Sequence, residues 1–397
     1  MKKRPIAALR RLAVLLSTLL LALLALLVME SPARADDLTV DLYTVGAGSY
    51  LYSAHGHTAL CVTGGPHPEG RCYDYGIANV EGDLNMFWRS LRGEPIFVVV
   101  GVDQKVLVAA FGAEERIIEK QRLPLSQAEA HALYEAVESD VNNKVAYAYH
   151  PSTANCTTKV RDVIDRVMGG KLHEIGPAKN VPRFREILES GYRGKMLTLA
   201  VIALFSGTTI ERTPTPWEHM FFPARLRDAV EERFGVKPER VYGREGIDLA
   251  LTTLGGRVLL VLVGAVLAAL IFRARRDDDK LRRELRFAAF ILGLLGLFVY
   301  GFAIIFVYPE LSHNWVMSVL WPTDLGLRWL SGVWLRRYVT VRLGAVALFG
   351  LLSLAGVIVQ PIASVALMAA LPFAAALFAL RERAPAPSPD IAKVVSG

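Results

Sequence analysis

A single cysteine lies where a helix start would favour a nucleophile. In the stretch HPSTANCTTKVRDVID, from His150 to Asp165, the residues before Cys156 are of the types that cap helices, and apolar residues then recur at helical spacing. Unpaired backbone N–H groups and the helix dipole at such a position favour a thiolate over a thiol. The alternative from this stretch alone is a small, mostly buried cysteine in a first helical turn.

A thiol nucleophile needs a base, and several histidines precede and follow the cysteine. His57, in YSAHGHTALCV, is the best placed, because Gly56 allows close approach and TALCV is typical of a strand that would hold an imidazole rigidly. Its alternative role is a partly buried histidine bonded to the backbone. His55 would face the opposite side of an extended segment, so the two do not form a metal pair. The sequence indicates no metal site and no cofactor; the other histidines considered are His67, His131, His150, His173 and His219.

The other two of the three cysteines flank a turn. Cys61 and Cys72 bracket TGGPHPEGR, a Gly/Pro-rich segment between two strand-like runs, so a hairpin would let them form a disulfide in an oxidising compartment. Cys156 is then left unpaired. In an exported protein such a cysteine is either an intermolecular bridge or a reactive thiol.

The composition divides the chain between water and lipid. Of 397 residues, 53% are hydrophobic, which is too apolar for a pair of soluble domains. The net charge is +7, but the basic residues cluster beside apolar runs, which indicates membrane topology rather than nucleic-acid binding.

The amino-terminal region predicts export. Residues 1–35 combine a basic start, an apolar run and an A-x-A pattern ending at Ala35, as in a signal peptide; an uncleaved anchor is the alternative. Residues 36–250 have the composition of a soluble α+β domain outside the cytoplasm. We expect strands in the runs LTVDLYTV, HTALCVTG, RCYDYGI and IFVVVGV and a helix in LSQAEAHALYEAVESDV.

Residues 251–383 predict a membrane domain. Five apolar blocks, at 254–272, 287–308, 315–335, 343–359 and 362–380, are each near the length that crosses a bilayer. The third block is interrupted by Pro322, Asp324 and Arg328. If it crosses, the basic segments 273–286, 336–342 and 381–383 all fall in the cytoplasm, so we expect five helices, with Asp324 and Arg328 paired on one of them. Residues 384–397 are expected to be a disordered cytoplasmic tail.

Five stretches carry a family resemblance. The order His before Cys is the inverse of the papain order and resembles the circularly permuted members of that superfamily. More specifically, the chain resembles the Lnb family of bacterial lipoprotein N-acyltransferases in GHTAL (Gly56–Leu60), YDYGIANV (Tyr73–Val80), NCTTKVRDVID (Asn155–Asp165), PWEHMFFPARL (Pro216–Leu226) and HNWVMSVLWP (His313–Pro322).

The resemblance implies a permuted papain-like periplasmic domain followed by about five transmembrane helices, in the bacterial inner membrane. The expected reaction moves a fatty acyl chain from phospholipid to the amino group of a lipidated lipoprotein N-terminus. Cys156 would be the nucleophile and His57 its base, with Asp74 as the orienting residue and Asn79 as the alternative to it. Four residues are expected at the substrate: Asn155, Thr157, Trp217 and His313.

One short apolar run and three rival functions remain open. MLTLAVIALF (Met196–Phe205) is too short to span, and is either a core element or a surface that dips into the outer leaflet, extended by Trp217, Phe221 and Phe222. The rivals to the acyltransferase are a membrane-bound thiol phospholipase, an NlpC-like cell-wall cysteine peptidase and a non-catalytic scaffold.

Overall fold

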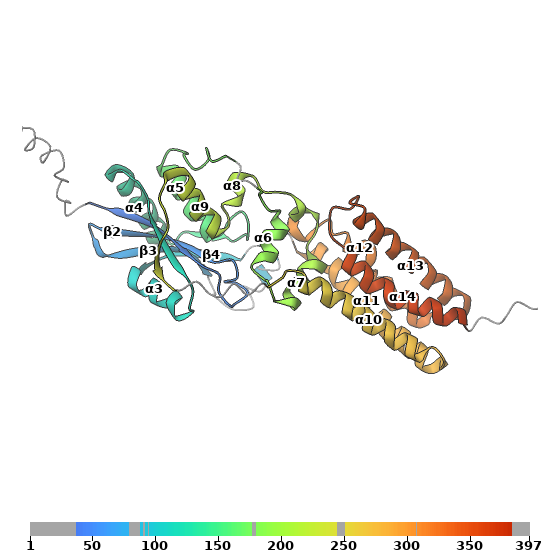
Figure 1. Cartoon of the computed structure of the whole chain (residues 1–397). Helices are drawn as coiled ribbons and strands as arrows, with labels where there is room; N and C mark the ends of the chain where they lie inside the picture. The colour runs from blue at the N-terminus through green and yellow to red at the C-terminus, as the bar shows by residue number, and fades with distance from the viewer. Residues whose placement is uncertain are drawn as a thin grey trace, which may run out of the picture.

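The computed structural model describes residues 37–78, 88–89, 92–93, 95–176, 180–243, 251–306 and 308–382. The expected export signal, Asn79 and the expected tail lie outside these residues. The described chain forms a sheet domain (residues 37–243) followed by a bundle of long helices (residues 255–382), which lie end to end (Figure 1).

The sheet domain is built on one antiparallel sheet. Seven strands pair in the order β6-β4-β3-β2-β1-β5-β7, so the first three strands of the chain form its centre. All four expected strand runs and the expected helix are confirmed, within a few residues at their ends. The strands are β1 Thr39–Val45, β2 His57–Gly64, β3 His67–Ala78, β4 Ile96–Asp103, β5 Ile118–Arg122, β6 Ala146–Ala148 and β7 Glu239–Tyr242.

Helices cover both faces of the central strands. Successive side chains of a strand point to opposite faces. Leu42 of β1 therefore packs in one apolar core, and the next residue, Tyr43, packs in a second core on the other face. The first core is closed by three helices and the second by α3. The helices are α3 Gln104–Ala113, α4 Gln127–Asn142, α5 Cys156–Val167 and α9 Pro223–Phe234.

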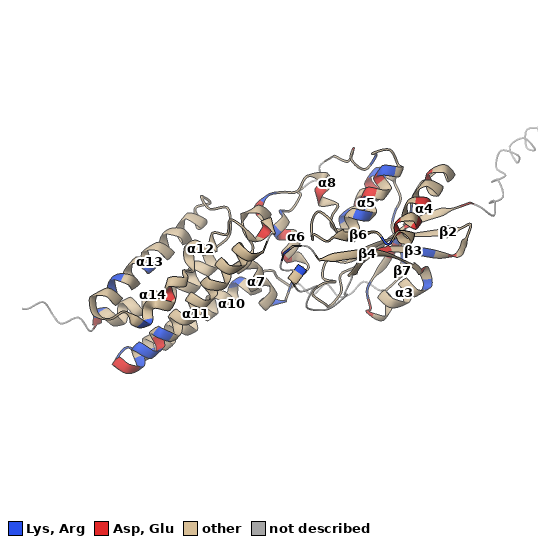
Figure 2. Cartoon of the chain, turned by 180° about the vertical axis from the view of Figure 1, so that it is seen from behind, with Lys and Arg blue, Asp and Glu red and all other residues tan. Residues whose placement is uncertain are grey.

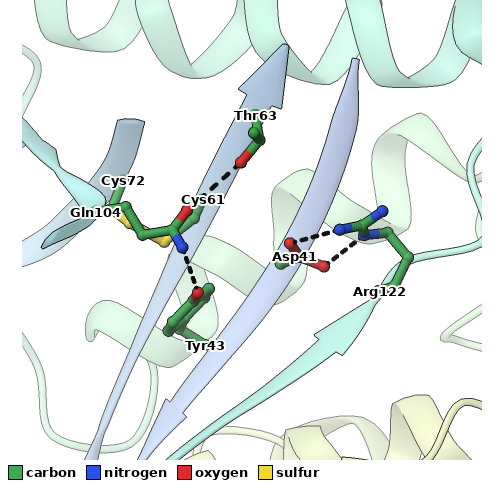
Figure 3. Close-up of a disulfide and its surroundings, with 7 residues drawn as sticks. All are labelled: Asp41, Tyr43, Cys61, Thr63, Cys72, Gln104 and Arg122. Atoms are coloured by element: carbon green, nitrogen blue, oxygen red, sulfur yellow. Dashed lines mark hydrogen bonds and ion pairs between the residues drawn. A yellow bond between two sulfur atoms is a disulfide. The ribbon is translucent and has the colours of Figure 1, made fainter. Parts of the chain in front are cut away.

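A disulfide links the two central strands β2 and β3. Cys61 and Cys72 are direct neighbours in the register of these strands and are bonded to each other. Figure 3 shows the surroundings, where Gln104 donates to the Tyr43 hydroxyl at 2.8 Å. The bridge fixes the β2–β3 hairpin on the face that packs against α3.

In the described part of the chain, four short helices lie between α5 and α9, and two of them, α7 and η1, contact the bundle. The four are α6 Phe184–Ser190, α7 Met196–Phe205, η1 Thr208–Glu211 and α8 Pro216–His219. The apolar run Met196–Phe205 is α7. Ala200, Ala203 and Leu204 join the core of the bundle, as expected of a core element, whereas Leu197 is 72% exposed.

Four helices of the bundle are long and apolar enough to cross a membrane: α10 Gly255–Ala274, α11 Asp278–Ile305, α13 Gly332–Leu354 and α14 Ala363–Glu382. The prediction of five such helices is therefore wrong. The third apolar block forms only the short helix α12 Val316–Val319 and the 3₁₀ helix η3 Pro322–Trp329, before α13 begins. Proline at the first turn of η3 cannot donate a helical hydrogen bond to the preceding turn, so no continuous helix forms.

The expected pairing within this block is also wrong. Asp324 accepts two hydrogen bonds from Arg342 of α13, at 2.7 and 2.8 Å, and both side chains are fully buried. Arg328 instead lies over the ring of Trp329. The segment 336–342 is not a loop but the first part of α13.

The irregular block nevertheless runs from one end of the bundle to the other. At its start, Asn314 bonds to Gln360, beside the sheet domain; further along, Leu325 packs against Gly293 in the middle of α11. The opposite end gathers the basic segments, where Arg336 of α13 donates to the Leu380 carbonyl of α14. Figure 2 shows charged residues concentrated at this far end, with largely uncharged helices between it and the sheet domain.

Candidate active site

Cys156 is the first residue of α5. Asn155 caps the helix: its side chain accepts from the Thr158 amide at 2.9 Å, while the Thr158 hydroxyl accepts from the Asn155 amide at 2.8 Å. The cap fixes where the helix begins. The thiol is therefore held in the first turn, where free amides and the helix dipole favour an anion.

His57 is the first residue of β2, and a hydroxyl pair ties this strand to α5. Thr58 and Thr157 are both buried, and their hydroxyl oxygens lie 3.0 Å apart. Gly56 precedes the histidine with a φ of +90°, where a Cβ would lie 2.5 Å from the Val45 carbonyl oxygen. A glycine is needed there for the chain to turn into β2.

Asp74 of β3 orients the histidine. Nε2 of His57 and Oδ1 of Asp74 are 2.9 Å apart, with side chains 13% and 10% exposed. The same Oδ1 accepts from the Gly76 amide at 2.7 Å, which holds the carboxylate in place. Because Nε2 is used by Asp74, Nδ1 is the ring nitrogen left for the thiol.

The electrostatics of the three groups favour an ion pair. Burial would lower the pKa of His57, but the charges of Asp74 and of the Cys156 thiolate raise that pKa well above its ordinary value. Burial opposes ionisation of the thiol, yet the neighbouring His57 charge and hydrogen bond lower the pKa of Cys156. Burial likewise opposes ionisation of Asp74, and the His57 charge outweighs it, so the pKa of Asp74 is lowered. The site is thus poised as a thiolate beside an imidazolium.

Sequence reasoning missed three contributors to this site. The Thr58 amide donates toward the sulfur and helps to lower the pKa of Cys156. Gly76 leaves space for the imidazole, since a Cβ there would lie 2.4 Å from Cε1 of His57. Arg116, 4% exposed, bonds to the Gly46 carbonyl at 2.9 Å and has its pKa lowered by burial, while the charge of the Cys156 thiolate acts in the opposite direction. None of the three could be recognised from its sequence neighbours, because each contacts a residue that is many positions away in the chain.

The four residues expected at the substrate are not brought together. Asn155 and Thr157 flank the thiol, but their side chains are used for capping and for the bond to Thr58. Trp217 is stacked between Arg161 and His173. His313 lies at the bundle end, where its carbonyl accepts from the Thr208 amide, and it makes no described contact with the three catalytic candidates.

Three of the remaining histidines, His55, His150 and His173, have other polar partners. His55 contacts the Leu188 carbonyl at 3.0 Å, and His150 lies 3.4 Å from Glu310. His173 pairs with Asp165 at 2.5 Å, and burial lowers the pKa of His219. Within the part of the chain that the structure describes, no group of His, Cys, Asp and Glu could hold a metal ion.

Comparison with known protein families identifies the domain that contains the candidate site. Residues 30–189 match the model of the Lnb N-terminal periplasmic domain. This part of the chain is therefore an Lnb N-terminal periplasmic domain. The matched range contains Cys156, His57 and Asp74, so the three groups lie inside the Lnb domain. The protein is thus a membrane protein with an Lnb periplasmic domain, because four membrane-capable helices follow that domain in the described chain.

Two of the five resembling stretches, Pro216–Leu226 and His313–Pro322, lie beyond the matched range. Searches of curated proteins and of solved structures found no match to the chain. The chemistry of this protein must therefore be argued from its own site.

Proposed function

We propose that this protein is a lipoprotein N-acyltransferase of the inner membrane that works through a Cys156 thioester. The observation that carries the proposal is the Cys156–His57–Asp74 arrangement inside an Lnb periplasmic domain that continues into membrane-capable helices. A histidine on a strand and a cysteine opening a helix, in that chain order, support a permuted papain-like plan for this domain.

The first half-reaction forms the acyl-enzyme. The Cys156 thiolate attacks the carbonyl carbon of a phospholipid ester and gives a tetrahedral oxyanion. The Thr58 amide, which points to the sulfur, and the free amides at the start of α5 are the nearest donors for that oxyanion. When the C–O bond breaks, the His57 imidazolium gives its proton to the departing lysophospholipid oxygen, and a thioester remains on Cys156.

The second half-reaction transfers the acyl group. The amine of a lipidated N-terminal cysteine attacks the thioester carbonyl, and neutral His57 takes the proton that the amine loses. The C–S bond then breaks, which regenerates the thiolate–imidazolium pair and leaves an amide on the acceptor. Asp74 keeps Nδ1 of His57 directed at the sulfur in both steps through its bond to Nε2.

The same first step serves a phospholipase, so the acceptor decides between the two functions. Water in place of the amine would release a free fatty acid. The membrane-capable helices favour a lipid substrate over peptidoglycan, because cleaving a cell-wall peptide needs no membrane domain.

Two measurements test the proposal. Purified protein incubated with phospholipid and no amine should gain a hydroxylamine-sensitive acyl group on Cys156, found by peptide mass spectrometry. In cells depleted of their own N-acyltransferase, expression of the protein should yield triacylated lipoprotein N-termini.

Variants give the controls. Cys156→Ser should abolish both signals, since a hydroxyl ionises far less than a thiol. His57→Ala should lower the rate about a hundred- to ten-thousandfold, whereas His131→Ala, at an exposed position of α4, should not. Triacylated lipoprotein in cells that carry only Cys156→Ser would refute the thioester mechanism; free fatty acid in place of the amide would establish the phospholipase.

A further inference from the structure

The loop before His57 carries exposed apolar side chains that the chemistry does not use. In the loop Ser49–Tyr52, between β1 and β2, Leu51 is 58% exposed and Tyr52 is 81% exposed. The rings of Tyr50 and Tyr52 stack with their centroids 5.4 Å apart. Three adjacent exposed side chains of this kind, Tyr50, Leu51 and Tyr52, are unusual on a surface that contacts only water. They indicate that the loop contacts an apolar partner.

The loop is tied to the start of α7. The Tyr192 hydroxyl donates to the Leu51 carbonyl at 3.2 Å, and the Lys195 ammonium donates to the Ser49 carbonyl at 2.7 Å. Lys195 directly precedes α7, whose outer face exposes Met196, Leu197 and Val201. The loop Ser49–Tyr52 and the outer face of α7 together form what we call the α7-side patch.

The α7-side patch lies beside the first turn of a membrane-capable helix, α10. Gly256, in the first turn of α10, lies against α7 so closely that a Cβ there would be 2.3 Å from the Leu199 carbonyl carbon. Exposed apolar residues also follow along α10 every four positions, on the face turned away from α7, as expected of a helix side that contacts lipid. They are Leu254, Val258, Leu262 and Val266.

We propose that the α7-side patch lies in the outer leaflet of the membrane that holds the bundle, and that it presents phospholipid to Cys156. Tyrosine and lysine are suited to the level of the lipid headgroups, because each combines an apolar body with a polar end. His57 follows Tyr52 by only five positions, so it stays close to the membrane surface. The delivery of substrate rests on the proposed function; the contact with lipid does not.

Contact of the patch with lipid can be measured by fluorescence on the full-length protein in phospholipid nanodiscs. In a Cys156→Ala background, Leu51→Cys is labelled with an environment-sensitive dye and compared with Val106→Cys on α3, since these side chains are 58% and 57% exposed. At position 51 we expect blue-shifted emission, quenching by spin-labelled lipid and protection from aqueous iodide. Equal iodide quenching at both positions would overturn the proposal, and so would protection at position 51 without quenching by lipid, which would mean that protein covers the patch.

Delivery of phospholipid can be measured as the rate at which Cys156 is acylated. The double variant Leu51→Asp/Tyr52→Asp should lose about tenfold or more of its rate with bilayer phospholipid, because charged side chains resist burial in lipid. It should keep its rate with a short-chain, water-soluble ester, and Val106→Asp should keep both rates.

Each other outcome has a separate meaning. Equal losses with both esters would mean that the loop shapes the catalytic site rather than contacting lipid, and no loss with either would leave the patch without a role in delivery; both overturn the inference. If the unsubstituted protein forms no acyl-enzyme with any ester, the proposed function fails, while the fluorescence comparison still decides whether the patch contacts lipid.

Discussion

Gly76 is the position at which one added methyl group should stop the chemistry without unfolding the domain. A Cβ at Gly76 would lie 2.4 Å from Cε1 of His57 and 3.1 Å from Oδ1 of Asp74. Carbon atoms in contact are normally about 3.5 Å apart, so the imidazole must move by about 1 Å. A displacement of about 1 Å in a catalytic group can cost about a hundredfold in rate, and we expect Gly76→Ala to lose that much.

A neighbouring glycine supplies the matched control. At Gly101 of β4 a Cβ would also lie 2.4 Å from its nearest atom, but that atom is Nη2 at the flexible end of Arg71. Neither glycine has a positive φ, so alanine strains the backbone at neither position. Gly101→Ala should therefore keep its rate within a few-fold, because the guanidinium can swing aside.

The assay has two readings for each variant. The first is the rate at which Cys156 is acylated by phospholipid, and the second is the rate of its alkylation by iodoacetamide at pH 6, which reports the thiolate fraction. Thermal melting by circular dichroism checks that both variants are folded. A folded Gly76→Ala protein that acylates as fast as Gly101→Ala would refute the reasoning, since His57 would then tolerate a shift away from its place between Asp74 and Cys156.

Three further predictions address charge and stability. Because the charge and hydrogen bond of His57 lower the pKa of Cys156, alkylation of Cys156 should persist as the pH falls below the ordinary range of a thiol. His57→Ala removes both and should shift this profile to higher pH; an unchanged profile would contradict the ion pair. Reduction of the Cys61–Cys72 bridge, which closes an 11-residue separation, should destabilise the sheet domain by about 3 kcal/mol, seen as a lower melting temperature with dithiothreitol. Arg342→Met should destabilise the bundle by about 3–5 kcal/mol, because it leaves the buried Asp324 without its charged partner. Arg328→Met is the control and should have little effect on unfolding in detergent. Equal effects of the two substitutions would contradict the pairing of Arg342 with Asp324.

Local patterns were sufficient to predict β1 to β4, the helix α4 and the position of the thiol. Capping residues and helical spacing placed the start of α5 at Cys156, and the alternating runs placed β1 to β4. Both are short-range properties, in which each residue's preference depends on neighbours a few positions away. The choice of Asp74 over Asn79 came from the resemblance, and the structure places the Asp74 carboxylate against His57.

The rest of the site depends on contacts that the sequence does not display. Gly76 is within reach of His57 only because β2 and β3 pair in one register, 19 positions apart along the chain. Arg116, two positions before β5, likewise depends on a partner far away in the chain, the Gly46 carbonyl. The substrate-site prediction for Trp217 and His313 was carried by motif resemblance alone, and in the described structure they contact neither His57 nor Cys156.

The wrong helix count shows what loop charge can and cannot indicate. Charge grouping predicted which ends of the bundle lie together, and Arg336 of α13, Leu380 of α14 and the start of α11 do share one end. The same charge argument counted the interrupted block as a fifth helix, and that count was wrong, because loop charge indicates which ends lie together but not whether the segment between them is a continuous helix.

Polar partners elsewhere in the bundle make an irregular crossing tolerable in lipid. Backbone groups outside a helix must be satisfied by protein at that depth. Arg342 donates to the Val319 carbonyl at 2.7 Å as well as to Asp324, and the Tyr300 hydroxyl donates to the Met317 carbonyl at 3.0 Å. One arginine thus neutralises the buried carboxylate and also bonds a carbonyl that a continuous helix would have paired internally. The interrupted block can therefore connect the two ends of the bundle without being a fifth helix, and the loop charges keep their grouping.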